Sequence, residues 1–144
     1  EKEDGIRKSQ KILLTWLVSD ERVFRQIKDY ISPEDFSDGV YRKAAELLFA
    51  QYQEGDVNPA RIMNHFTDEE EHREVASLFH TRIEELTSER EKEKALMETV
   101  LRIKNHSIEE AGRKLEPSDI AGLQRLMEAK RKLQDLKGLH ISIN

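Results

Sequence analysis

The sequence contains no cysteine, which excludes a disulfide framework, a thiolate nucleophile and a cysteine-ligated zinc site. It contains only 3 prolines and 6 glycines, and no low-complexity linker or internal repeat. No apolar run reaches the roughly 18 residues that a membrane-spanning helix requires. The polar start EKEDGIRKSQ does not have the pattern of a signal peptide, and the missing initiator Met suggests a fragment or a processed chain. These absences together suit a cytoplasmic protein.

Charged residues and hydrophobic residues each make up 37% of the 144 positions. The apolar share is low, but the apolar positions are periodic, which indicates amphipathic helices rather than disorder. The net charge of −5 is unevenly distributed: residues 1–87 carry 12 basic and 19 acidic side chains, whereas residues 88–144 carry 12 and 10. Neither half is basic enough to indicate nucleic-acid binding, but the asymmetry suggests that the halves meet different surroundings.

The clearest helix signals lie between residues 32 and 66. Ser32-Pro33-Glu34-Asp35 has the order of an N-cap, a proline at the first helical position and acidic residues in the first turn. Between residues 40 and 52, apolar side chains recur at steps of three and four on two adjacent stripes. Such a helix must be covered by others, so we predict residues 40–52 to be the central helix of a small bundle. Gly55 predicts its end, and a short helix over residues 59–66 follows.

Three further helices complete the predicted bundle. The dense apolar run at residues 12–18 favours a buried helix over a buried strand, because helix formers precede it and an N-cap follows it. The next helix starts at about Glu21 and ends before Pro33. Thr67-Asp68-Glu69-Glu70 matches a capping box and predicts a helix behind it. The candidate core residues of the bundle are Leu13, Leu17, Phe24, Ile27, Leu47, Leu48, Phe49 and Phe79.

A second capping box at residues 88–91 opens a long helix that runs to about Glu116, with a soft spot at residues 105–107. Residues 117–119 break and re-cap the chain, and residues 120–137 form the last helix, which ends before Gly138. We therefore expect an all-α fold: a helical bundle over residues 1–87, followed by a long antiparallel helical hairpin over residues 88–144. We expect each hairpin helix to have one neighbour over most of its length.

No residue pattern indicates catalysis. The five histidines lack a metal-ligand spacing, and no Gly-rich phosphate loop or nucleophile motif is present. Adjacent acids such as Glu84-Glu85 point in different directions on a helix, so they do not form a general acid/base pair. We expect no catalytic residue, metal, cofactor or small-molecule substrate. Lys130-Arg131-Lys132 complements the C-terminal end of a helix dipole, with phosphate contact as the alternative.

The last helix carries more apolar surface than one neighbour covers. Gly122, Leu126, Ala129, Leu133 and Leu136 form one stripe, and Ile120, Leu123 and Met127 form a second beside it. The two stripes together span roughly 200° of the helix, about twice what packing against the preceding helix requires. The surplus either folds back on the bundle or binds a partner. The candidate partner-binding residues are Ile120, Leu123, Met127, Leu133 and Leu136.

The order of these elements, together with the start RKSQKILLTWL, resembles the C-terminal helicase-binding domain of bacterial DNA primase. The segment with Asp35-Phe36, Tyr41, Ala45-Glu46-Leu47-Leu48-Phe49, Tyr52, Gly55 and Asp56 is also similar to the N-terminal domain of the replicative helicase. The two families share a fold, which accounts for the double match. The resemblance covers essentially the whole chain, and its motifs concern packing.

The resemblance to primase implies a non-catalytic docking domain. Its hairpin would bind the N-terminal ring of the replicative hexameric helicase, recruit primase for RNA primer synthesis in DNA replication, and modulate the helicase ATPase and unwinding activities. The polymerase (DNA-directed RNA polymerase, a nucleotidyltransferase) and zinc domains of primase would lie upstream. Two alternatives stay open: the self-association domain of the helicase itself, and a helical nucleic-acid-binding domain that uses residues 130–132. We expect no direct nucleic-acid contact and no membrane association.

Overall fold

The computed structural model describes residues 2–37, 39–80 and 89–139, apart from the side chains of residues 2–4, 80 and 89. Within these ranges the fold is all-α, as the periodicity predicts. The elements are α1 (Lys2–Ser19), α2 (Glu21–Ile27), the 3-10 helix η1 (Pro33–Asp35), α3 (Val40–Glu54), α4 (Pro59–Asn64), α5 (Glu69–His80), α6 (Glu89–Lys114) and α7 (Ile120–Lys137). No helix in the described ranges is long and apolar enough to cross a membrane.

Local signals set most of the helix ends. The Asp20 carboxylate accepts a hydrogen bond from the Arg22 amide and caps α2, while Asn58 caps α4 in the same way. Gly55 ends α3 in the left-handed conformation, with φ +80°, which glycine adopts without steric cost. The sequence predicts Thr67 as the cap of the next helix, but the cap is Asp68. α5 starts at Glu69, and the Asp68 carboxylate accepts a hydrogen bond from the Glu71 amide at 3.0 Å. The capping box at residues 88–91 begins outside the described residues.

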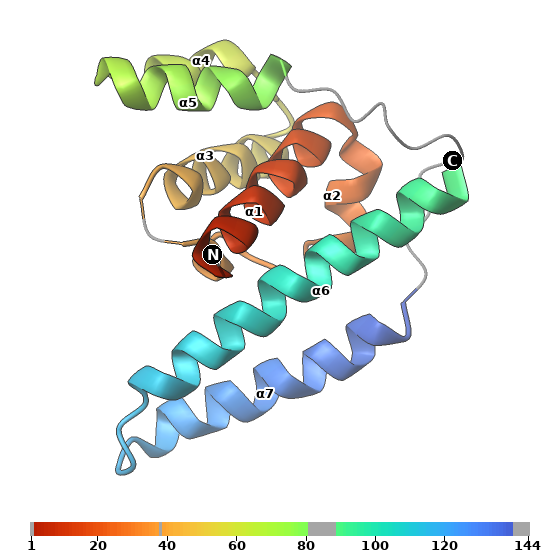
Figure 1. Cartoon of the computed structure of the whole chain (residues 1–144), viewed down its shortest axis with the longest axis vertical. Coiled ribbons are helices and arrows are strands. Elements are labelled where there is room, and N and C mark those ends of the chain that lie inside the picture. Colours follow the sequence, from red (N-terminus) through yellow and green to blue (C-terminus); the bar gives the residue numbers. More distant parts are fainter. Residues whose placement is uncertain (1, 38, 81–88, 140–144) are drawn as a thin grey trace.

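The helix at the centre of the molecule is α1, whereas the sequence favours α3. α1 packs against α2, α3, α5 and α6 (Figure 1). Five consecutive residues of its apolar run, 13–17, are all buried. A helix that is buried on every side can lie only where neighbours surround it, and α1 is the helix with that environment. Figure 1 shows α3, α4 and α5 on one side of α1 and α6 on the other.

The predicted core residues fall into two groups. Most of them are almost completely buried: Leu13, Leu17, Phe24, Ile27, Leu48 and Phe49. Leu47 and Phe79 are only partly buried, and they pack against the edge of the core. Leu47 differs from Leu48 because α3 has an outer flank that no other helix covers, so only part of its apolar surface reaches α1.

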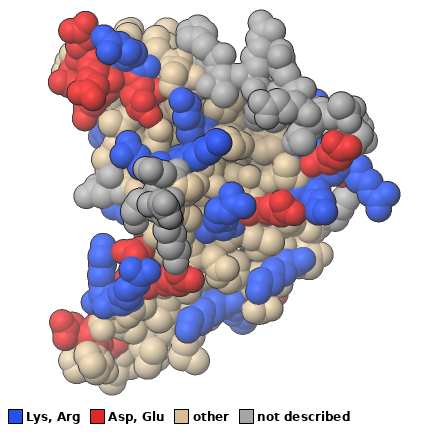
Figure 2. Space-filling view, viewed as in Figure 1, with Lys and Arg blue, Asp and Glu red and all other residues tan. Residues whose placement is uncertain are grey.

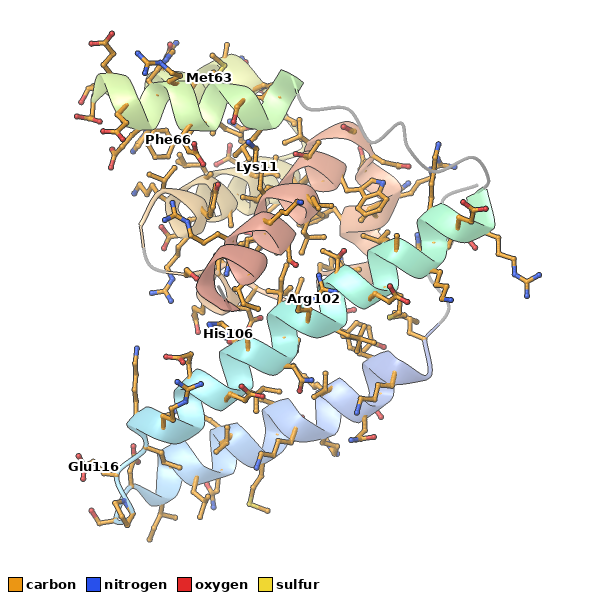
Figure 3. The ribbon with its side chains drawn as sticks, in the orientation of Figure 1. Lys11, Met63, Phe66, Arg102, His106 and Glu116 are labelled. Atoms are coloured by element: carbon orange, nitrogen blue, oxygen red, sulfur yellow. The ribbon has the colours of Figure 1, made fainter. Side chains whose placement is uncertain are left out.

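The two long helices form an antiparallel hairpin, but α6 has other neighbours besides α7, and η1 is one of them. It packs against α1 on one side and α7 on the other (Figure 1), so the expectation of a single neighbour is wrong for α6. Leu96, Val100 and Ile103 of α6 belong to the same buried cluster as the residues of α1. Figure 3 shows Arg102 on this helix, and its guanidinium donates to the Ser9 hydroxyl across 2.8 Å.

The expected boundary at residue 87 lies within the undescribed segment 81–88, and the hydrophobic core is continuous across it. The predicted soft spot at residues 105–107 is helical, since α6 runs unbroken from Glu89 to Lys114. The turn that contains Glu116 connects α6 to α7 at the end of the hairpin, on the far side of the molecule from α4 and α5 (Figure 3). This arrangement leaves α7 at the outer edge of the molecule.

Candidate interaction surface

α7 begins at a strong local signal. Pro117 and Ser118 break the preceding helix, and the Asp119 carboxylate accepts a hydrogen bond from the Gly122 amide at 2.8 Å. The helix then runs for 18 residues to Lys137. Because α6 is the neighbour that it packs against most closely in the described structure, its faces have different environments.

One face of α7 is committed to the protein core. Gly122, Leu133 and Leu136 are buried, while Leu126 and Ala129 are partly buried. These five residues are the first stripe that the sequence predicts. The proposal of Leu133 and Leu136 as partner-binding residues is therefore wrong: they are 6% and 0% exposed and belong to the core. Both lie in the C-terminal half of α7. This half packs beside the part of α6 that also contacts α1.

The second stripe remains on the surface. Ile120 is 71% exposed, Leu123 45% and Met127 62%, and they are the exposed large hydrophobic residues of the described chain. Their spacing of three and four residues places them in one row along the helix, and we call this row the α7 stripe. The alternative in which this surplus folds back on the bundle is wrong for these three side chains. They form an apolar surface that nothing in the described structure covers.

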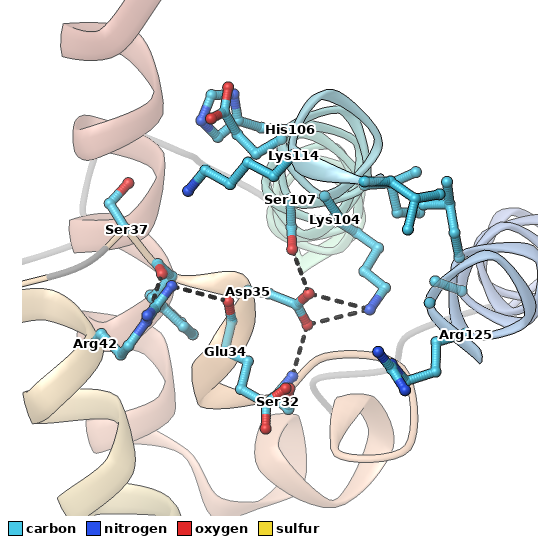
Figure 4. A pocket seen from close by; sticks show the side chains of 18 of the residues that line it. Ser32, Glu34, Asp35, Ser37, Arg42, Lys104, His106, Ser107, Lys114 and Arg125 are labelled. Atoms are coloured by element: carbon cyan, nitrogen blue, oxygen red, sulfur yellow. Dashed lines mark hydrogen bonds and ion pairs between the residues drawn. The ribbon is translucent and has the colours of Figure 1, made fainter. Parts of the chain in front are cut away.

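A cleft lined by both polar and apolar residues lies on another side of the hairpin. It has a volume of about 690 Å³ and is lined by η1, the start of α3, the second half of α6 and the first half of α7 (Figure 4). At its base, the Asp35 carboxylate receives hydrogen bonds from the Lys104 ammonium at 3.1 and 3.2 Å and from the Ser107 hydroxyl at 2.7 Å. The amide of Ser32 donates to the same carboxylate at 2.8 Å.

These contacts give Asp35 a structural role. Its side chain is 8% exposed and that of Lys104 is 12%, so the ion pair is largely removed from water. A buried carboxylate is tolerated when a cation and several donors satisfy its oxygens, and Asp35 has both. It ties η1 to the middle of α6. Its donors are the Ser32 amide, the Lys104 ammonium and the Ser107 hydroxyl, so this carboxylate is occupied in holding the two elements together.

The sequence predicts the local contact of Asp35 but not its contacts with α6. Asp35 stands in the first turn after Ser32, and the backbone contact to Ser32 agrees with the predicted N-terminal signal. The contacts with Lys104 and Ser107 join residues 69 and 72 positions apart, for which no local pattern exists. Ser107 lies in the stretch that appears weak as a helix, and its hydroxyl provides one of the links to the bundle.

Within the described residues, no group of three or more His, Asp or Glu side chains is placed to hold a metal ion. The cations at residues 130–132 are all exposed, and Arg131 pairs with Glu128 at 2.6 Å. Three consecutive helical residues point about 100° apart, so they do not converge on one phosphate. Comparison of the chain with protein-family models, with curated proteins and with solved structures found no significant match. The surface that distinguishes the described structure is therefore the α7 stripe.

Proposed function

We propose that this chain is a non-catalytic protein–protein docking domain whose α7 stripe binds a partner protein. The observation that carries the proposal is the α7 stripe itself, in which three large apolar side chains stay exposed on a helix whose opposite face is built into the core. Burial of such a stripe against a partner helix removes apolar surface from water, which is the main source of affinity in helix-in-groove contacts.

For the identity of the partner, the proposal relies on the resemblance to the helicase-binding domain of bacterial DNA primase. The partner is then the N-terminal ring of the replicative hexameric helicase, in the cytoplasm. Docking would bring the primase polymerase to the replication fork for primer synthesis, and it would alter the ATPase and unwinding activities of the helicase. The all-α fold with a long C-terminal hairpin supports this assignment, as does the apolar surface on the hairpin.

The experiment measures binding of the chain to the isolated helicase N-terminal ring by calorimetry. We expect Leu123→Asp and Met127→Asp each to weaken binding at least about tenfold, because a buried charge without a partner is costly. Ala121→Asp is the matched control, since residue 121 is exposed on α7, lies away from the stripe and receives the same charge. Binding of the ring with unchanged affinity by both stripe variants would overturn the proposal.

The alternative of self-association predicts a different result for the same variants. If the stripe pairs with a second copy of the chain, sedimentation of the isolated protein will show a dimer, and Leu123→Asp will convert it to a monomer. Nucleic-acid binding is less well supported, because the central part of the exposed α7 surface is apolar and the consecutive cations at residues 130–132 point in different directions. Such binding would appear as salt-dependent retention of single-stranded DNA.

A further inference from the structure

The charge of α7 is opposite to that of the rest of the chain. The helix carries five basic and two acidic side chains, a formal balance of +3, whereas the whole chain has −5 and its remainder therefore −8. All seven of these charged side chains on α7 are exposed. Figure 2 shows basic side chains over the hairpin with acidic ones among them, and a dense acidic group at the upper left, where α5 begins with Glu69, Glu70 and Glu71. The exposed apolar row thus lies on a basic helix of an acidic protein.

The cations are placed unevenly around the α7 stripe. Lys130 and Arg131 follow Met127 by three and four residues, so they stand one turn beyond it on the same side of the helix. Lys137 follows Lys130 by seven residues and continues the same row. Lys132 points about 200° away from Lys130, which places it off the stripe.

Not all of these charges are neutralised by the protein itself. The Arg131 guanidinium is held by Glu128 at 2.6 Å. Lys130 and Lys137 form no ion pair with any residue of the described structure. Two cations that have no ion-pair partner among the described residues therefore border one edge of the exposed apolar row.

We infer that the α7 stripe takes the apolar side of an acidic amphipathic helix, whose carboxylates pair with Lys130 and Lys137. This inference rests on the proposed function, because it names the chemistry of the partner at the same surface. The apolar contact supplies most of the affinity, and the charge complementarity increases the association rate and disfavours basic partners. A nucleic acid fits less well, because its phosphates would face an apolar row.

The test uses two designed helical peptides of about 18 residues, roughly 27 Å long, which matches the length of α7. Both carry Leu at the same positions of one face; the flanking positions are Glu in one peptide and Lys in the other. Binding to the isotope-labelled chain is followed by amide chemical shifts. We expect the acidic peptide to bind at least about tenfold more tightly at low salt, with the largest shifts at Ile120, Leu123 and Met127. We expect this preference to shrink at about 1 M salt, where the Debye length is about 3 Å.

A pair of variants separates a local charge contact from a general effect of net charge. Lys130→Glu should weaken binding of the acidic peptide about fivefold and improve binding of the basic one. Lys132→Glu changes the net charge equally, but it lies off the stripe and should change either affinity by less than about twofold. Equal effects of the two variants would overturn the inference. So would tighter binding of the basic peptide, equal binding of both peptides, absence of binding by either, or shifts that map away from α7.

The outcomes also distinguish the inference from the function. If the helicase ring binds through the stripe but Lys130→Glu and Lys132→Glu affect that binding equally, the docking function stands and the acidic partner is wrong. If the acidic peptide binds as expected but the helicase ring does not, the surface chemistry stands and the helicase is the wrong partner. Displacement of the acidic peptide by single-stranded DNA, with shifts on the same residues, would instead favour nucleic acid.

Discussion

Asp35 is the residue on which the contact between η1 and α6 depends most. Its carboxylate binds the Lys104 ammonium, the Ser107 hydroxyl and the Ser32 amide, all at 3.2 Å or less. A buried ion pair adds little net stability compared with well-packed apolar residues, but removing one partner leaves the other charge buried. Asp35 and Lys104 therefore stabilise the fold only as a pair.

We predict that Asp35→Ala lowers the free energy of unfolding by about 3 kcal/mol, because the Lys104 ammonium then stays desolvated without a counter-charge. Urea unfolding followed by circular dichroism measures this loss. The double variant Asp35→Ala with Lys104→Met should recover part of it, since it removes the unpaired charge. A loss below about 1 kcal/mol in the single variant would show that water reaches the pair.

Two tyrosines have hydroxyl groups that are held inside the fold. Burial and, after it, the hydrogen bond to Glu74 together raise the pKa of Tyr41 to about 12. Burial also raises the pKa of Tyr52 to about 12, with the charges of Glu21 and Asp20 adding to the effect. The Tyr52 hydroxyl donates a hydrogen bond to the carbonyl oxygen of Leu17 in α1.

These shifts predict a loss of stability in alkali. Unfolded tyrosine ionises near pH 10, and the folded side chains keep their protons to about pH 12. The folded state thus binds more protons in this window, so the free energy of unfolding falls as the pH rises from 10 to 12. An alkaline titration of tyrosinate absorbance should show two late ionisations, with Tyr41→Phe and Tyr52→Phe each removing one. Ionisation of every tyrosine near pH 10 in the folded protein would contradict this.

Where α6 turns into α7, the side chains of Leu115 and Asp119 lie close to the backbone of Gly122. A Cβ on Gly122 would lie 2.4 Å from the Asp119 carboxylate and 2.7 Å from the Leu115 side chain. Asp119 is also the residue that caps α7 at this amide. A methyl group at residue 122 must therefore displace either the cap or the neighbouring leucine.

We predict that Gly122→Ala destabilises the protein by about 1 kcal/mol, because loss of the cap and overpacking together exceed the gain in helix propensity. Gly112→Ala is the matched control. It is also helical, its Cβ would meet only Leu126 at an ordinary 3.8 Å, and it should stabilise by about 0.5–1 kcal/mol. Thermal unfolding of both variants tests the difference, and equal effects would show that the hairpin adjusts to the extra methyl group.

At the scale of the whole molecule, one hydrophobic core joins the bundle to the hairpin. Leu96, Val100 and Ile103 of α6 are fully buried in the same cluster as Leu13 and Leu17 of α1. The other half of the hairpin differs, because residues 111–114 and 116–121 are exposed. The hairpin is thus part of the core at one end and a surface projection at the other.

This division predicts a gradient of amide hydrogen exchange along α6. Amides near Val100 should be protected as strongly as those of α1, since both exchange only when the shared core opens. Amides of the last turn of α6 and the first turn of α7 should exchange through local opening at lower free energy. Leu48→Ala, a core change worth about 2–5 kcal/mol, should lower protection near Val100 as well as in α3. Uniformly fast exchange over the whole of α6 would show that the hairpin unfolds independently.

Much of the fold follows from local signals. Residues such as Asp20, Gly55 and Asn58 set helix ends within a few positions of themselves, so the bounds of α3 and α7 agree closely with prediction. The two stripes of α7 also follow from helical geometry. Helical geometry does not determine which of the two stripes is buried, because Leu133 and Met127 are both apolar side chains. The position of α6 buries Leu133 and leaves Met127 exposed.

The sequence by itself therefore determined the all-α class, the order of the helices and the surplus of apolar surface on α7, although α2 ends at Ile27 and not just before Pro33. Caps, turns and amphipathic periodicity act over at most a few turns of chain, and each is complete within the segment that carries it. Only the tertiary structure decided that α1 is the central helix, that α6 lies between α1 and α7, and that Asp35 pairs with Lys104. Those outcomes depend on which surfaces meet, and contacts between residues 69 positions apart arise from the packing of whole helices.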